Sequence, residues 1–325
     1  MGCVDDLQFS DVEELTLALM HSRAEVERLG QREQLFSTLL ASVNAVLWAF
    51  DWNESRVVYV SPAYEKVFGR SAALLLADYR EWLDSIYPDD VEYAAESFAQ
   101  VLETGSVEVR EYRILRSDGQ LRWISDKCFL SKQPGSGEWP LIVGIAEDIT
   151  EKKRLEGELH RLATQDPLTQ CSNRRFFFEQ AQEAFAYARQ NGGPLAFLLL
   201  DIDDFKHIND RHGHQMGDQV LAQVAHAATN ALRAGDLFGR IGGEEFAAVF
   251  PGCESSLAEQ IAARLQREIQ RLAFCGADGQ EFRVTASQGL TTLRAGDEQL
   301  DLLFARADAA MYRAKREGKN RVLVA

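Results

Sequence analysis

The stretch LAFLLLDIDD (Leu195 to Asp204) says most about the fold of this chain. Its first six residues are all apolar, a run typical of a strand that is buried on both faces or nearly so. The run leads directly into Asp201, Asp203 and Asp204. Carboxylates at the end of a buried strand are costly without counter-charge, which a divalent cation supplies. The alternative is that Asp203 or Asp204 only caps the helix that follows.

A second acidic motif, GGEEF, begins at Gly242 and lies between two strand-like runs. Two adjacent glycines predict a tight hairpin turn, because such turns need positive φ angles. Gly242 and Gly243 also leave room for a nucleotide to approach the backbone. We expect Glu244 and Glu245 at the tip of the hairpin to face Asp201 across neighbouring strand ends. That arrangement suits phosphoryl transfer with two metal ions.

The order of elements around these motifs predicts an α+β domain. Asp166-Pro167 marks its start, because the residue before a proline is disfavoured in a helix. Strands that alternate with helices around one hairpin favour a ferredoxin-like sheet, which we expect to be covered on one face. The predicted elements are helices at Arg174 to Arg189, Gly217 to Leu232, Ser256 to Leu272 and Asp301 to Glu317, strands at Leu195 to Ile202 and Arg283 to Thr292, and the hairpin Leu237 to Phe250.

The first 165 residues carry two helical segments and, between them, a region of short strands. Residues 1–34 predict one helix, and residues 151–165 predict a second that acts as a signalling connector. A spacing of three and four residues favours a two-helix seam, with packing of the first helix on its own domain as the alternative. The first apolar stripe consists of Val12, Leu15, Leu19, Val26, Leu29, Phe36 and Leu40, interrupted by Ser22 and Glu33, and the second of Leu155, Leu159 and Leu162.

Residues 35–150 resemble a PAS sensory domain. The resemblance rests on the segments YVSPAYEKVFG (59–69), IYPDD (86–90), YRILRSDGQLRWI (112–124) and GIAEDITEKK (144–153). It implies an antiparallel sheet that cups a small cavity and is flanked by helices. The tryptophans of this region either fill its core or line a ligand pocket. No histidine lies between His21 and His160, which disfavours a histidine-ligated haem, whereas a flavin, another small molecule or no ligand all stay open.

Residues 166–325 resemble the GGDEF family of diguanylate cyclases. Five motifs occur in the family's order: DPLTQCSNRR (166–175), DIDDFKHINDRHGHQMGD (201–218), RAGDLFGRIGGEEF (233–246), VTASQGL (284–290) and ADAAMYRAKREGKNR (307–321). The resemblance implies a nucleotidyl-cyclase-like domain that condenses two GTP into cyclic di-GMP and two pyrophosphates under the control of the PAS domain. Each domain is expected to hold one GTP, so the working unit is expected to be a homodimer.

The resemblance also assigns roles to individual residues. Glu244 and Glu245 are the expected catalytic residues, with Glu244 as the candidate general base for the 3′-hydroxyl. Two Mg²⁺ ions per active site are expected, with Mn²⁺ as an alternative metal. Their expected ligands are Asp201, the backbone carbonyl of Ile202, Glu244 and Glu245.

Several further residues are expected to bind substrate. Asn209 and Asp218 resemble the pair that reads the guanine edge, and His214 is either a substrate contact or structural. Lys315 and Lys319 resemble a phosphate-binding pair that lies on one helix face, because the two are four residues apart. Lys206 and Arg240 either help to neutralise phosphates or are ordinary surface cations.

Arg233 and Asp236 form an RxxD pattern that resembles the family's inhibitory site for the product, cyclic di-GMP. Two rivals to the cyclase are a catalytically silent GGDEF domain that senses nucleotides, and a cyclase that makes a cyclic mononucleotide or a mixed dinucleotide. Retention of Asp201, Glu244, Asn209 and Asp218 favours the active cyclase over the first rival.

Composition restricts the partners and the compartment. The net charge of −15 disfavours a broad surface for nucleic-acid phosphates. The longest apolar runs are far too short to cross a bilayer, and the N-terminus has no basic region typical of a secretory signal. Five scattered cysteines without a CxxC pair indicate a reducing cytoplasm and disfavour a disulfide framework.

Overall fold

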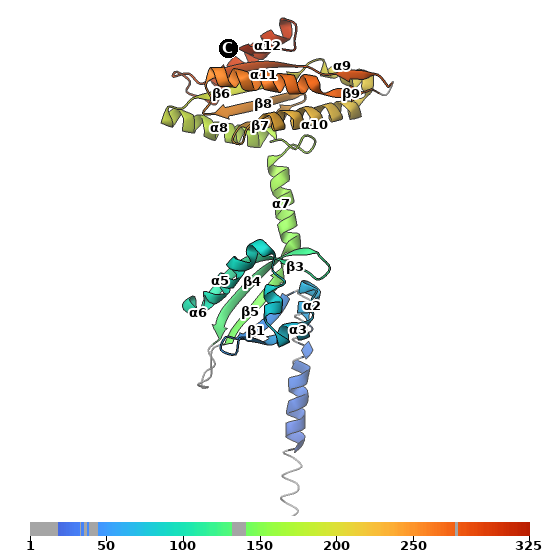
Figure 1. Ribbon diagram of the computed structural model, residues 1–325, viewed down its shortest axis with the longest axis vertical. Helices are drawn as coiled ribbons and strands as arrows, with labels where there is room; N and C mark the ends of the chain where they lie inside the picture. Colours follow the sequence, from blue (N-terminus) through green and yellow to red (C-terminus); the bar gives the residue numbers. More distant parts are fainter. Residues whose placement is uncertain (1–18, 33, 36–37, 39–44, 132–140, 277–278) are drawn as a thin grey trace, which may run out of the picture. The chain divides into compact units, whose positions relative to one another are not determined.

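The computed structural model (Figure 1) describes residues 19–32, 34, 35, 38, 45–131, 141–276 and 279–325. The chain divides into two compact units, and the boundary between them falls between Glu156 and Gly157, within helix α7 (Thr150–Thr164). Among the described residues, every helix is too short or too polar to span a membrane.

Residues 19–32 are helical and exposed. Leu19, Val26 and Leu29 of the predicted stripe are each more than half exposed. Val12, Leu15, Glu33, Phe36 and Leu40 lie outside the described residues, so the two-helix seam stays a prediction.

The first unit contains one antiparallel sheet of five strands in the order β2-β1-β5-β4-β3. The turn at Asp118-Gly119 joins β3 to β4 as predicted, with Gly119 at a φ of 80°. The strands are β1 (Ala45–Asp51), β2 (Arg56–Val60), β3 (Ser106–Leu115), β4 (Leu121–Ser131) and β5 (Leu141–Asp148).

Side chains alternate between the two faces of this sheet. On β4 and β5, Ile124, Cys128, Ile142 and Ala146 are buried in the core, whereas Phe129 is half exposed on the other face. The helical segments between β2 and β3 complete that core. They are α2 (Ala63–Phe68), α3 (Ala72–Ala77), α4 (Arg80–Leu83), the 3-10 turn η1 (Pro88–Asp90), α5 (Val91–Ala99) and α6 (Val101–Thr104). The fold implied by the PAS resemblance is confirmed.

The second unit is built on a five-stranded sheet in the order β12-β11-β6-β8-β7, in which only the pair β11 and β12 is parallel. Strand β6 lies at the centre, and all eight of its residues are buried, as its apolar run predicts. The strands are β6 (Leu195–Ile202), β7 (Leu237–Gly242), β8 (Glu245–Pro251), β11 (Ala286–Thr292) and β12 (Val322–Val324).

The expected single strand at 283–292 is divided in two. Its first residue ends β10 (Glu281–Arg283), which pairs with β9 (Ala273–Cys275) in a separate two-stranded ribbon. Strand β11 begins only at Ala286, where pairing with β6 starts.

The expectation that helices cover one face of this sheet is wrong. Ala196, Leu198 and Leu200 of β6 belong to one hydrophobic core, together with residues of α10 (His214–Ala231) and α11 (Ser255–Arg271). The intervening Leu195, Phe197 and Leu199 belong to a second core, with α8 (Arg174–Asn191) and α12 (Leu300–Arg316). A strand that is apolar at every position needs cover on both faces, because its side chains alternate.

The sequence also missed a helix. Directly after β6 the chain forms α9 (Phe205–His212), and Gly213 at a φ of 85° separates it from α10. Helix α10 therefore begins at His214, three residues before the predicted start.

Candidate active site

The structure brings the acidic ends of β6 and of the β7–β8 hairpin together. Asp201 is the register partner of Glu245 on the neighbouring strand β8. Glu244 lies in the turn between β7 and β8, and its backbone carbonyl accepts a hydrogen bond from the Ile202 amide at 3.3 Å. The four residues expected to bind metal thus lie together where β6 ends and β8 begins, at one end of these neighbouring strands, as the hairpin geometry predicts.

Asp201 is a buried carboxylate with one basic partner and two acidic neighbours. Its side chain is buried, and its carboxylate forms an ion pair with Lys315 Nζ at 2.7 Å. The pKa of Asp201 is raised to about 6: burial raises it most, the charges of Glu244 and Glu245 also raise it, and Lys315 opposes them. One lysine therefore does not balance the negative charge here, and a cation would.

The donor set fits a hard divalent cation. All four groups are oxygen donors, three carboxylates and one backbone carbonyl, the ligands that Mg²⁺ and Mn²⁺ prefer. Within the described residues, no three histidine, cysteine or acidic side chains are placed to hold a metal ion together, and this includes Asp201, Glu244 and Glu245. Mg²⁺ commonly takes one or two carboxylates and completes its shell with water and substrate phosphates, so this arrangement suits a metal that arrives with its nucleotide.

The other two aspartates after β6 have different partners. Asp203 is buried and accepts hydrogen bonds from Thr285 Oγ1 at 2.7 Å, Ser287 Oγ at 2.6 Å and the Asn320 amide at 3.0 Å. Asp204 occupies the N-cap position of α9 with a φ of 56°, but its side chain makes no capping hydrogen bond. The capping alternative is therefore wrong for both side chains, since Asp203 holds the loop after α12 and Asp204 pairs with a lysine.

That lysine is Lys319, whose Nζ lies 2.5 Å from Asp204 Oδ1. The expectation that Lys315 and Lys319 share a helix face is wrong, because α12 ends at Arg316 and Lys319 has a φ of 60°. Gly318, at a φ of 115°, turns the chain out of the helix. Both ammonium groups nevertheless reach the end of β6.

The predicted guanine-reading residues lie on two consecutive helices. Asn209 is on α9, and the exposed Asp218 is on α10. A Cβ atom built on Gly217 would lie only 1.9 Å from Asn209 Oδ1. The Asn209 side chain is therefore packed on the backbone next to Asp218, where only glycine leaves room for it. His214 and Lys206 are exposed on α10 and α9.

Arg240 has a structural role that the sequence did not indicate. Its Nε donates to the Gly243 carbonyl at 2.9 Å, and its Nη1 lies 3.2 Å from Asp166 Oδ1. Arg174 Nη1 also donates to the Ile241 carbonyl at 2.8 Å. Arg240 and Arg174 thus brace the hairpin that carries Glu244. The sequence signal at Asp166-Pro167 had indicated only a domain boundary.

Arg233 and Asp236 of the RxxD pattern are already paired. Arg233 Nε lies 2.8 Å from Asp236 Oδ1, and its Nη2 donates to the Pro251 carbonyl at 2.9 Å. The Arg233 side chain is 42% exposed, so one side of this pair faces solvent ahead of β7.

Comparison with known proteins identifies both units. The GGDEF domain of diguanylate cyclases matches residues 163–321, and a PAS fold family matches residues 57–146. A diguanylate cyclase from Vibrio cholerae is 32% identical over 268 residues, which cover 82% of each chain. Diguanylate cyclase DgcM from Escherichia coli K12 is 38% identical over 185 residues, 57% of this chain and 44% of that protein.

Among solved structures, the coiled coil and GGDEF domain of DgcB from Caulobacter crescentus, in complex with c-di-GMP, has a TM-score of 0.50. It is 34% identical and covers 54% of this chain and 94% of that one. The match of the GGDEF family and the match over 82% of both chains to the Vibrio protein agree. The chain therefore belongs to the diguanylate cyclase family, with a GGDEF domain that follows a PAS domain.

Proposed function

We propose that this protein joins two molecules of GTP into cyclic di-GMP under the control of its PAS domain. The 3′-oxygen of one GTP attacks the α-phosphorus of the other, and the bond to pyrophosphate breaks. The hydroxyl proton leaves to a base, and a second such step closes the ring. The observation that carries the proposal is the buried Asp201, which shares one edge of the sheet with Glu244 and Glu245.

The residues at this edge divide the work. Asp201, the Ile202 carbonyl, Glu244 and Glu245 would hold two Mg²⁺ ions, or Mn²⁺ in their place. When bound, such ions stabilise charge on the phosphates and make a hydroxyl more acidic. Glu244 is the candidate base that takes the 3′-hydroxyl proton.

Substrate recognition falls to residues around that edge. Asn209 and Asp218 would read the guanine edge, with His214 and the backbone at Gly242 and Gly243 close to the nucleotide. Lys315 and Lys319 would exchange their carboxylate partners for phosphate oxygens as GTP and its metal arrive, because Asp201 is then neutralised by the cation. Lys206 is exposed and suits a supporting phosphate contact, whereas Arg240 serves the hairpin.

The assembly and the compartment are parts of the same proposal. One GTP per domain requires two domains to complete the ring, so we infer a homodimer. We infer a reducing cytoplasm from the five scattered cysteines of the sequence, which contain no CxxC pair.

Regulation by product is the second part. The Arg233 guanidinium is 42% exposed and suits a phosphate or guanine oxygen of cyclic di-GMP, whereas the Asp236 side chain is fully buried against it and would have to separate from Arg233 to contact guanine. Arg233→Ala should relieve inhibition by added cyclic di-GMP and leave the initial rate close to wild type. An inhibition curve that stays the same would exclude this pair as the controlling site.

Product analysis tests the proposal as a whole. The full chain is incubated with Mg²⁺ and GTP, and separately with an equimolar mixture of ATP and GTP, and the products are separated chromatographically. We expect cyclic di-GMP and two pyrophosphates per turnover in the first reaction, and the same dinucleotide in excess in the second. A mononucleotide or mixed product would show a different cyclase, and no product from a folded dimer would show a nucleotide sensor.

A further inference from the structure

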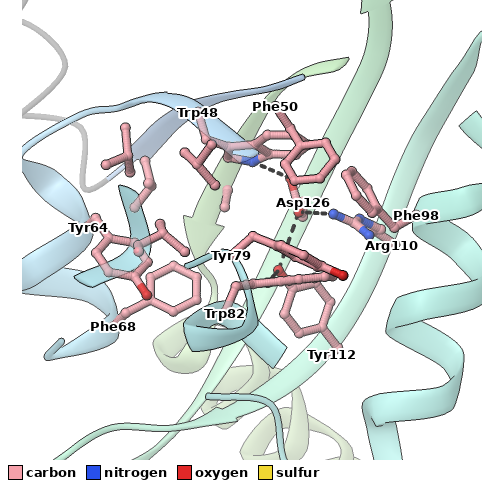
Figure 2. Close-up of a pocket in the computed structure, with 15 residues that line it drawn as sticks. Trp48, Phe50, Tyr64, Phe68, Tyr79, Trp82, Phe98, Arg110, Tyr112 and Asp126 are labelled. Carbon is pink, nitrogen blue, oxygen red and sulfur yellow. Dashed lines mark hydrogen bonds and ion pairs between the residues drawn. The ribbon is translucent and has the colours of Figure 1, made fainter. Parts of the chain in front are cut away.

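The PAS domain contains a cavity in its core (Figure 2). The cavity leaves about 50 Å³ free for the centre of a water molecule. Most of its wall is apolar or aromatic, and the rings come from β1, β3 and the helical segments between β2 and β3. Trp48 and Phe50 come from β1, Tyr79 and Trp82 from the segment around α4, and Phe98 from α5.

A charged pair lies in this wall. Arg110 Nη2 and Asp126 Oδ2 are 2.6 Å apart, and the two side chains are only 1% and 2% exposed. Asp126 also accepts from Trp48 Nε1 at 3.1 Å and from the Tyr112 hydroxyl at 3.3 Å. Every partner is a donor, so these hydrogen bonds favour the carboxylate form of Asp126 against burial, which raises its pKa.

Arg110, in contrast, is not satisfied. It donates to Asp126 and to the Ala94 carbonyl, but its Nε has no hydrogen-bond partner although it is buried. A buried donor without an acceptor is costly, and a guanidinium nitrogen can only donate. An irregularity in β3 between Val107 and Arg110 precedes this side chain, and such bulges commonly re-aim a residue.

Aromatic rings surround the guanidinium. Its Cζ lies 5.1 Å from the centroid of Phe98 and 5.3 Å from that of Trp82. Phe98 in turn meets Trp48 and Phe50 edge-on, at 5.8 and 5.3 Å. A planar ring can insert among such rings with edge-to-face contacts.

Tyr64 supplies a second polar group, on the opposite side of the cavity from Arg110 (Figure 2). Its side chain is buried, and its hydroxyl also has no hydrogen-bond partner. Burial raises the pKa of Tyr64, so the hydroxyl stays protonated and can donate. Arg110 Nε and the Tyr64 hydroxyl are therefore both hydrogen-bond donors that lack an acceptor.

We propose that this cavity binds a compact, uncharged aromatic molecule that presents a carbonyl oxygen or a ring nitrogen to Arg110 Nε. The aromatic wall selects the ring, and the unpartnered donor selects the acceptor. Asp126 already neutralises Arg110, so an anionic ligand would bring an uncompensated charge into the core. At about 50 Å³ the cavity is smaller than the roughly 150 Å³ that takes a benzene ring, so one ring is the upper limit and its entry requires the surrounding side chains to move apart.

Three probes of nearly equal shape separate these requirements. Acetophenone carries a ring and a neutral carbonyl, α-methylstyrene replaces that carbonyl by an isosteric carbon–carbon double bond, and benzoate carries a charge. Binding of each to the full chain is measured by isothermal titration calorimetry. We expect acetophenone to bind at least about tenfold more tightly than either of the others, because only it gives Arg110 a neutral acceptor.

A double variant isolates the donor. Arg110→Met with Asp126→Asn removes both charges together and keeps an acceptor for Trp48, so the core is not left with one unpaired charge. We expect α-methylstyrene to bind this variant within about twofold of wild type, while acetophenone loses its tenfold advantage. Tyr93→Phe on the exposed face of α5 is the matched control and should change neither affinity.

Each other result overturns the inference. Equal binding of acetophenone and α-methylstyrene would show a purely apolar cavity, and tighter binding of benzoate would show an anion site. No binding of any probe at millimolar concentration would mean that the cavity holds only water. Because calorimetry does not depend on turnover, these outcomes are independent of whether the proposed cyclase reaction is correct.

Discussion

Asp126 in the PAS domain and Asp201 in the GGDEF domain are both buried aspartates, and each forms one ion pair. Each is buried, and each has one basic partner, Arg110 at 2.6 Å and Lys315 at 2.7 Å. Their other neighbours are opposite in kind. Asp126 receives further hydrogen bonds from Trp48 and Tyr112, whereas the charges that act on Asp201 are those of Glu244 and Glu245.

The difference shows how similar pairs acquire different roles. The pair around Asp126 is closed, because both charges are inside the core and donors saturate the carboxylate. The pair around Asp201 is open, because like charges crowd the carboxylate and Lys315 is 35% exposed at its other side. The closed pair of Arg110 and Asp126 forms part of the wall of the PAS cavity. The open pair of Asp201 and Lys315 keeps excess negative charge, which a metal cation can neutralise.

Breaking the closed pair should have the largest effect. Arg110→Ala leaves the Asp126 charge alone in the core and should lower the free energy of unfolding of the PAS domain by about 3–5 kcal/mol. All five tryptophans lie between residues 48 and 139, so tryptophan fluorescence during urea unfolding reports on this domain alone. The double variant Arg110→Met, Asp126→Asn should lose much less. Equal losses in the two variants would contradict the closed-pair description.

Removing one like charge from the open site should cost activity and not stability. Glu244→Gln keeps the shape of the hairpin tip but removes a metal-binding charge, and turnover should fall by at least about a hundredfold. Turnover is measured as the initial rate of cyclic di-GMP formation, and stability as the thermal unfolding followed by far-ultraviolet circular dichroism. Glu298→Gln, an exposed position of the same domain, is the control. Near wild-type turnover of the Glu244 variant would show that Glu244 is not needed for metal binding or catalysis.

Gly217→Ala should affect the open site less than Glu244→Gln does, and mainly through substrate binding. A methyl group there would collide with Asn209 Oδ1, and displacing that amide should raise the KM for GTP by about tenfold while kcat changes less. Gly157→Ala is the matched control, because a Cβ at Gly157 has no neighbour within 4 Å. If Gly217→Ala leaves the KM unchanged, Asn209 does not read guanine from its observed position.

The smallest effect is expected from the unpartnered hydroxyl opposite the closed pair. Tyr64→Phe removes a buried group without a partner and should raise the free energy of unfolding of the PAS domain by about 1 kcal/mol. Tyr112→Phe should act in the opposite direction, because the Tyr112 hydroxyl accepts from Trp82 and donates to Asp126. Tryptophan-detected urea unfolding distinguishes them, and a loss of stability in Tyr64→Phe would indicate a partner such as bound water.

The motifs of the GGDEF domain were readable from sequence because strands and hairpins are local. A short apolar run that ends at Asp201 is typical of a buried strand, and Gly242-Gly243 favours a tight turn. Their pairing across the sheet then follows from register. The same run also indicated burial on both faces of β6, which the expectation of cover on one face of the sheet did not take into account. What could not be read is the separation of Lys315 from Lys319, because α12 ends at Arg316 and Gly318 follows with a φ of 115°.

The sequence by itself determined the family, the acidic edge and the residues expected to bind metal and guanine, because these are encoded in short stretches with fixed spacing. Only the tertiary structure decided how distant side chains pair. Arg240 with Asp166, Asn209 with the bare backbone of Gly217, and Arg110 with Asp126 are contacts between separate elements. Whether a charge is open or closed depends on every neighbour within a few ångströms, and only the folded core brings those neighbours together.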